Sequence, residues 1–130
     1  KVIIISNQSG IGRGYFNEND YQKLTEWMLK QFNKKGISIL DILYCPHGPE
    51  SKCNCRKPKP GMLIEAKCKY NISMQDSWMI GDKETDIEAA NLAGITNTIL
   101  VRSGHLINEG DSNSKFIIDS IKQSKEIIKK

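Results

Sequence analysis

No apolar run in the 130-residue sequence is long enough to span a bilayer, and no signal-peptide pattern opens it. The chain also lacks internal repeats and any linker. Its length and its 38% hydrophobic content provide material for one compact core. We therefore expect residues 1–130 to form a single domain that has no membrane partner.

Basic residues outnumber acidic ones, and the net charge is +4. The lysines are scattered along the chain with a concentration near its C-terminal end, and the basic residues of that tail are not interleaved with aromatic residues. Such a distribution is typical of a solvated face rather than of a nucleic-acid site. We expect no nucleic-acid partner.

One stretch of seventeen residues, 45–61, contains no aliphatic hydrophobic residue and no Phe, Tyr or Trp, so it cannot fold by burying apolar surface. It does carry a complete set of tetrahedral zinc ligands: Cys45, His47, Cys53 and Cys55. A Cys₃His set leaves no open coordination position, which predicts a structural zinc that supplies folding free energy to the loop. A disulfide pair or unpaired surface thiols remain as alternatives.

Two cations follow the last of these ligands directly. Arg56 and Lys57 stand on a segment stiffened by Pro58 and Pro60, an arrangement suited to directing positive charge at an anion. The fourth cysteine, Cys68, falls on the predicted inner face of a helix. This use of cysteine favours a reducing, cytoplasmic location.

Strand and helix patterns alternate along the chain, which predicts an α/β fold. A helix is expected to begin after Asn17 and to end at Gly36, with Leu24, Trp27, Met28 and Phe32 on its core face. A second begins near Pro60 and a third covers Ile87 to Leu92. The predicted strands cover Val2–Ile5, which we expect to be buried on both faces, and Ile37–Tyr44, Ser77–Ile80 and Thr98–Val101.

Polar segments follow two of these strands, where open α/β sheets place their ligands. The first is Ser6 to Gly14, which an ordinary glycine-rich turn also explains. The second is Gly81 to Asp86, where Asp82 and Asp86 stand at the start of a helix. Helix capping explains one aspartate, but the pair beside a lysine favours a hard divalent cation.

The C-terminal part of the chain is less informative. Residues 102–115 are polar, and the lone His105 is expected to face solvent rather than to bind a ligand. A short strand over 116–118 and a lysine-rich helix that ends at Lys130 complete the chain.

Three motifs, Ser6 to Gly10, Arg56-Lys57-Pro58 and Gly81 to Asp86, together resemble the haloacid dehalogenase superfamily, and within it the phosphatases of heptose bisphosphate. The resemblance implies a three-layer, Rossmann-like fold: a parallel sheet with helices on both faces and an inserted zinc loop. It implies a monomeric enzyme that removes the 7-phosphate from D-glycero-D-manno-heptose 1,7-bisphosphate, a small-molecule substrate, in nucleotide-heptose synthesis for surface polysaccharide.

The resemblance also assigns roles to residues. Ser6 is expected to donate to the transferring phosphoryl group and Lys57 to stabilise it, while Arg56 recognises the substrate. Asp82 matches the ligand of a catalytic magnesium ion, with Lys83 counted in the same site and Asp86 in contact with the ligand rather than with the ion. The substrate would also contact the turn that follows Ser6, at Asn7, Gln8 and Ser9. All these groups are expected to converge in one cleft.

One feature of the superfamily is missing. Its enzymes carry an aspartate nucleophile and an aspartate acid/base in a D-x-D motif after the first strand, and none of the seven aspartates here stands in that context. We expect a nucleophile-bearing strand upstream, between the strand at Val2 and the strand ending at Ile80, and we expect these 130 residues alone to be unfolded and inactive. Alternatives are a histidinol-phosphate phosphatase and a catalytically dead phosphate-binding module; the zinc loop disfavours a DNA 3′-phosphatase.

Overall fold

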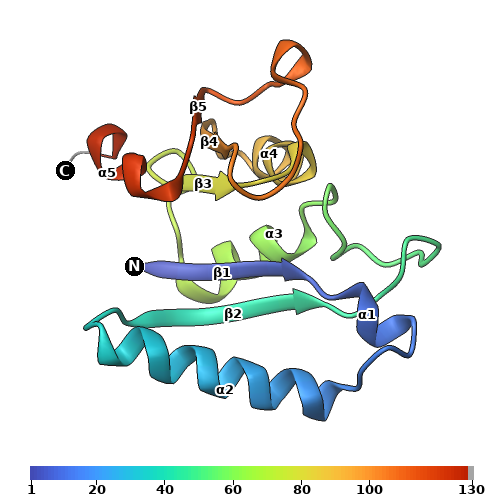
Figure 1. Cartoon of the computed structure of the whole chain (residues 1–130). Helices are drawn as coiled ribbons and strands as arrows, with labels where there is room; N and C mark the ends of the chain where they lie inside the picture. Colours follow the sequence, from blue (N-terminus) through green and yellow to red (C-terminus); the bar gives the residue numbers. More distant parts are fainter. Residues whose placement is uncertain (129–130) are drawn as a thin grey trace. The chain divides into compact units, whose positions relative to one another are not determined.

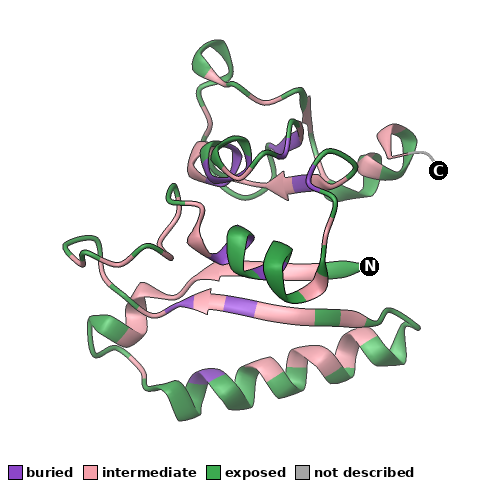
Figure 2. Cartoon of the chain, turned by 180° about the vertical axis from the view of Figure 1, so that it is seen from behind, coloured by how far each residue is buried: buried purple, intermediate pink, exposed green. Residues whose placement is uncertain are grey.

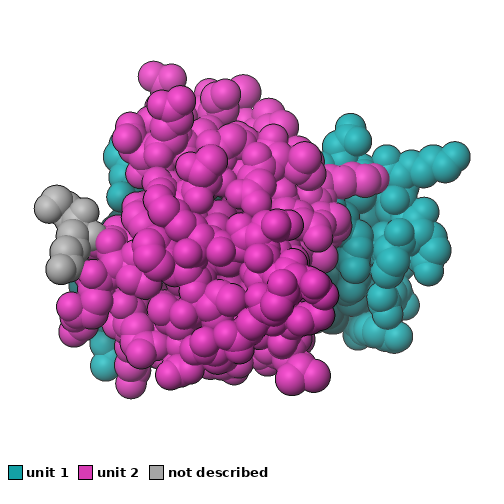
Figure 3. Space-filling model, turned by 90° about the horizontal axis from the view of Figure 1, so that it is seen from above, with its two compact units in different colours: residues 1–56 teal, residues 57–130 magenta. Residues whose placement is uncertain are grey.

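The computed structural model describes residues 1–128 (Figure 1). The chain divides into two compact units, residues 1–56 and residues 57–130, which Figure 3 draws in different colours. Both units are of the α/β type, and every strand pairs with its neighbours in parallel. The predicted α/β class is confirmed, and the expectation of one domain stays a prediction.

Unit 1 is built on a two-stranded parallel sheet. Strand β1 (Val2–Asn7) pairs with β2 (Ile39–Cys45), and the one-turn helix α1 (Ser9–Gly12) and the long helix α2 (Glu18–Lys34) connect them. Helix α2 contacts the sheet through Tyr21, whose ring centroid lies 4.4 Å from that of Tyr44. The register brings the polar residues after β1 beside Cys45, where the zinc loop begins.

Helix α2 begins and ends where the sequence predicts, but its core face is different. Asn17 caps the helix, since its side chain accepts a hydrogen bond from the Asp20 N–H at 2.8 Å. Leu24 and Trp27, predicted to lie in the core, are 61% and 59% exposed. A sheet of two strands is too narrow to cover the whole apolar stripe of a long helix, so only Tyr21 on α2 is fully buried.

Unit 2 contains a three-stranded parallel sheet in the order β3 (Trp78–Gly81), β4 (Asn97–Val101) and β5 (Phe116–Ile118). Helix α4 (Glu84–Leu92) packs against β3 and β4. Strand β4 is central, and Thr98 to Val101 on it are all buried (Figure 2). The remaining elements of this unit are α3 (Gly61–Tyr70), η1 (Glu109–Asp111), η2 (Ile121–Gln123) and α5 (Ser124–Ile127).

Three further expectations need correction. Strand β1 was expected to be buried on both faces, yet none of its residues is fully buried, because a two-stranded sheet has only edge strands. Cys68 is exposed rather than on an inner face. The C-terminal helix comprises only the short elements η2 and α5, and its predicted end at Lys130 lies outside the described residues. Within residues 1–128, no helix combines the length and the apolar character needed to cross a membrane.

Candidate functional site

The four predicted zinc ligands lie together in unit 1. Their ligand atoms are all within 4.8 Å of one another, and none of the cysteines forms a disulfide. His47 Nδ1 is 3.3 Å from the sulfur atoms of both Cys45 and Cys55. The Cys45 and Cys53 sulfur atoms are 3.7 Å apart, and those of Cys45 and Cys55 are 2.7 Å apart.

This donor set fits zinc. Zinc–sulfur bonds of about 2.3 Å in a tetrahedron place neighbouring sulfur atoms about 3.8 Å apart, close to the Cys45–Cys53 distance. Cys45 and Cys55 lie closer than that, so a bound ion would separate them slightly. The set of three thiols and one imidazole has the composition of a closed structural site.

The thiols of this cluster have unequal proton affinities. Burial is the largest single influence on the pKa of Cys53 and raises it. Several hydrogen bonds, led by those from the Arg56 backbone N–H and the Ser51 hydroxyl, together outweigh burial and lower the pKa to about 6. Burial, followed by the adjacent Cys45 and Cys53, raises the pKa of Cys55 to about 12. The crowded sulfur atoms cannot all ionise without a compensating charge, which a divalent cation would provide.

Backbone hydrogen bonds tie the zinc loop to the turn after β1. The Gln8 N–H donates to the Cys45 carbonyl at 2.7 Å, and the Gly12 N–H donates to the Pro46 carbonyl at 2.8 Å. A Cβ atom on Gly12 would lie 2.7 Å from that Pro46 oxygen, so glycine is needed for this close approach. The polar turn and the zinc loop therefore form one structure within unit 1.

Two predicted substrate residues interact in that turn. The Gln8 side-chain amide donates to Ser6 Oγ at 2.7 Å. Because the Ser6 oxygen accepts this bond, its own hydroxyl proton can be donated to an anion. Asn7 is the last residue of β1, and Ser9 begins α1. Arg56 donates to the His47 carbonyl at 3.4 Å, a weak bond that leaves most of its guanidinium donors available.

In unit 2 the Asp86 carboxylate organises the second polar site. Asp86 Oδ1 accepts from the Lys57 ammonium at 2.5 Å, and both side chains are nearly buried, at 7% and 11% exposure. Asp86 Oδ2 accepts from the backbone N–H groups of Asp82 at 3.1 Å and Lys83 at 3.2 Å. Three donors thus satisfy one carboxylate, so capping and charge pairing explain Asp86, and it is not arranged as a metal ligand.

This arrangement also explains Gly81. A Cβ atom at Gly81 would overlap the Asp86 side chain, so only glycine lets the strand end approach that carboxylate. The loop 81–83 therefore packs closely against the Asp86 side chain and donates a backbone hydrogen bond to it, and Lys57 pairs with the same carboxylate.

Asp82 has a partner that the sequence analysis missed. His105 Nδ1 lies 2.6 Å from Asp82 Oδ2. The expectation that His105 faces solvent is only partly right, because its side chain is 53% exposed but bonds to a predicted metal ligand. No local pattern could have revealed this pair, since 23 positions separate the two residues.

The predicted site residues thus form two groups. Unit 1 contains Ser6, Gln8, Arg56 and the predicted zinc ligands. In unit 2, the Asp86 carboxylate accepts hydrogen bonds from Lys57, Asp82 and Lys83. The convergence of both groups on one substrate stays a prediction.

Comparisons with known proteins place the chain in a class. The model of the HAD-hydrolase-like family matches residues 54–124. A crystal structure of D,D-heptose 1,7-bisphosphate phosphatase from B. bronchiseptica, complexed with magnesium and phosphate, superposes with a TM-score of 0.77. It is 29% identical in sequence and covers 89% of this chain and 67% of its own. The fold and the family model together define an α/β hydrolase of the HAD type.

Curated relatives agree with this class. A D-glycero-alpha-D-manno-heptose-1,7-bisphosphate 7-phosphatase from Photorhabdus laumondii is 45% identical over 88% of this chain and 66% of its own length. A D-glycero-beta-D-manno-heptose-1,7-bisphosphate 7-phosphatase from Pasteurella multocida is 42% identical over 98% of this chain and 73% of its own length. The chain belongs to the HAD-hydrolase-like family. It spans about two thirds of the length of the first of these relatives.

Proposed function

We propose that this protein is a magnesium-dependent phosphomonoester hydrolase that removes the 7-phosphate from D-glycero-D-manno-heptose 1,7-bisphosphate. The observation that carries the proposal is the arrangement around Asp86, which fixes the Lys57 ammonium and the Asp82 loop to one nearly buried carboxylate. Relatives named for this reaction, at more than 40% identity, support the choice of substrate.

Lys57 would stabilise the phosphoryl group during transfer. Its ammonium is bound to a carboxylate oxygen of Asp86 and its side chain is only 11% exposed, so it is largely shielded from water. A preorganised cation in such surroundings stabilises developing negative charge better than a solvated one does. Arg56, which precedes Lys57 in the chain, would recognise the substrate.

Magnesium would bind at Asp82. Among the described residues, hydrogen bonds to the Asp82 side chain engage only Oδ2, and the side chain is 37% exposed. Magnesium commonly binds through one or two carboxylates and keeps several waters, so the site fits this ion. When bound, the ion would neutralise phosphate charge and orient the substrate. The Lys83 ammonium has no lone pair to offer, so Lys83 could reach the ion only through its backbone carbonyl.

Ser6 would donate its hydroxyl proton to a phosphate oxygen, with the Gln8 amide orienting that hydroxyl. Asn7, Gln8 and Ser9 would contact the remainder of the substrate. The zinc ion held by the Cys₃His cluster would fix the loop that carries Arg56, and so it has a structural role.

The sequence has no D-x-D motif, so no residue of this chain is assigned the nucleophilic step. The residues described above bind, orient and neutralise. A phosphate-binding module without catalytic activity is the second candidate. We further propose a cytoplasmic monomer that acts on a small molecule.

The test is phosphate release by the complete protein from both anomers of heptose 1,7-bisphosphate, with histidinol phosphate as a competing substrate. We expect hydrolysis of the heptose only, and only with magnesium. Lys57→Ala should lower kcat far more than it changes KM, because the lysine acts mainly in the transition state. Tight heptose binding without turnover would indicate the binding module, and preference for histidinol phosphate would contradict the proposed substrate.

A further inference from the structure

The imidazole of His105 is the only side chain among the described residues with a hydrogen bond to the Asp82 carboxylate. An ionised carboxylate accepts hydrogen bonds but cannot donate them. The 2.6 Å contact therefore requires the proton on Nδ1 of His105, whether the ring is neutral or charged. The bond occupies Oδ2 and leaves Oδ1 for another ligand.

Gly104, the residue before His105, brings the loop against Asp82. A Cβ atom at Gly104 would overlap the Asp82 carboxylate, and the φ angle of Gly104 is outside the positive region. The requirement for glycine is therefore steric: the backbone must pass directly over Asp82 for the imidazole to reach it.

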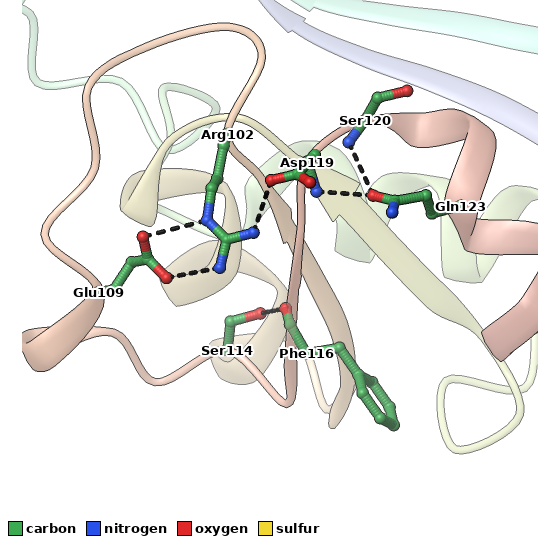
Figure 4. A network of polar contacts seen from close by, with 7 residues as sticks. All are labelled: Arg102, Glu109, Ser114, Phe116, Asp119, Ser120 and Gln123. Carbon is green, nitrogen blue, oxygen red and sulfur yellow. Dashed lines mark hydrogen bonds and ion pairs between the residues drawn. The ribbon is translucent and has the colours of Figure 1, made fainter.

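Ion pairs and hydrogen bonds hold the loop 102–115 on both sides of His105. The Arg102 guanidinium binds both Glu109 carboxylate oxygens, at 3.1 and 2.8 Å, and Asp119 at 2.8 Å (Figure 4). The Arg102 bonds hold the pKa of Glu109 below its usual value. At the far end of the loop, Glu84 accepts from the Ser112 hydroxyl at 2.8 Å and from the Asn113 N–H at 2.9 Å.

We propose that His105 is a positioning residue for the metal ligand Asp82. By donating to Oδ2, it holds the carboxylate in one orientation that presents Oδ1 to a divalent cation, and the braced loop fixes His105 in turn. Hydrogen-bond partners of metal ligands change metal affinity in this way in other proteins. The inference rests on the proposed function, because it takes Asp82 as the metal ligand.

The experiment is a titration of the purified protein with Mn²⁺, followed by electron paramagnetic resonance without substrate. We expect His105→Ala to weaken Mn²⁺ binding by about 10–100-fold. His105→Asn, which retains an N–H near the position of Nδ1, should restore most of the affinity, and His105→Gln, which places its N–H further out, should not. Unchanged zinc content and melting temperature would show that the fold is intact.

Asp82→Asn is the matched control and should abolish Mn²⁺ binding. If Asp82→Asn abolishes Mn²⁺ binding while His105→Ala binds Mn²⁺ as tightly as the wild type or more tightly, the role proposed for His105 is wrong and the proposed function stands. If Asp82→Asn itself leaves binding unchanged, the proposed metal site is wrong. Should His105→Ala fail to fold, equal affinities of the Asn and Gln variants would overturn the inference.

Discussion

The two units differ in what fills their interiors. Among the described residues, unit 1 has only Tyr21, Leu43 and Cys45 as buried hydrophobic side chains, whereas unit 2 has twelve. One of the three in unit 1, Cys45, is a predicted zinc ligand. Unit 2 instead surrounds β4 with apolar side chains, and Ile99 and Leu100 are completely inaccessible to solvent.

The difference indicates that the units obtain their stability from different sources. Apolar burial stabilises by about 25 cal/mol per Å², and unit 2 has enough of it to form a conventional core. Unit 1 has little apolar burial, and its longest irregular segment contains no aliphatic hydrophobic residue and no Phe, Tyr or Trp before Arg56. Metal binding can replace a missing core, since structural zinc sites contribute about 10–16 kcal/mol in small domains. We therefore expect zinc, bound at the Cys₃His cluster, to be the central stabilising element of unit 1.

The largest expected effect is the loss of the zinc site. Cys55→Ser removes a ligand from the cluster, and we expect zinc to be lost and unit 1 to unfold, because little apolar burial remains to hold it. Elemental analysis and thermal unfolding would measure both changes. Cys68→Ser is the control, since Cys68 is exposed and outside the cluster. Full zinc occupancy in Cys55→Ser would contradict the assignment.

A smaller effect is expected from the buried ion pair in unit 2. Asp86→Ala removes the partner of Lys57 and leaves the N–H groups of Asp82 and Lys83 without their acceptor. Breaking a buried pair in this way costs about 3–5 kcal/mol. Urea unfolding followed by circular dichroism would measure the loss. A change near zero would mean that Lys57 is solvated in solution and that Asp86 does not organise the site.

The apolar core of unit 2 should respond to truncation. Leu100→Ala on β4 creates a cavity at a fully buried position and should cost about 2–5 kcal/mol. Leu92→Ala, on a residue that is 67% exposed, is the matched control and should change stability by less than about 0.5 kcal/mol. Equal effects of the two substitutions would show that β4 is not the centre of the core.

The smallest effect concerns acid. Hydrogen bonds lower the pKa of Cys53 from 9.0 to about 6, so the stabilisation from its thiolate is fully present above pH 9 and is lost as the pH falls through about 6. Protons should therefore compete only weakly with zinc for Cys53 at neutral pH, and we expect zinc to be released only in acid, as a chromogenic zinc indicator would show. Release already between pH 7 and 8 would contradict the lowered pKa.

Local patterns in the sequence were sufficient to find most elements. The β-branched run Ile3–Ile5 marked β1, and the Asn17 cap marked the start of α2. The spacing of Cys45, His47, Cys53 and Cys55 identified the group that could hold a metal ion. Each of these signals depends on neighbours in the chain, which is why sequence alone could reveal it.

Features set by tertiary contacts were not predictable. The exposure of Leu24 and Trp27 depends on the width of the sheet beneath α2, which periodicity does not report. The pairing of His105 with Asp82 and the bracing by Arg102 both depend on how the chain after β4 folds back. Polar loop residues carry no periodic pattern, so their partners emerge only from the folded structure.

Hydrogen exchange with and without a zinc chelator tests the central claim most directly. After zinc removal, we predict that amides in β1 and β2 lose their protection while those in β4 keep theirs, because only unit 1 depends on the metal. Equal loss of protection in β2 and β4, or full protection of both after zinc removal, would contradict the account.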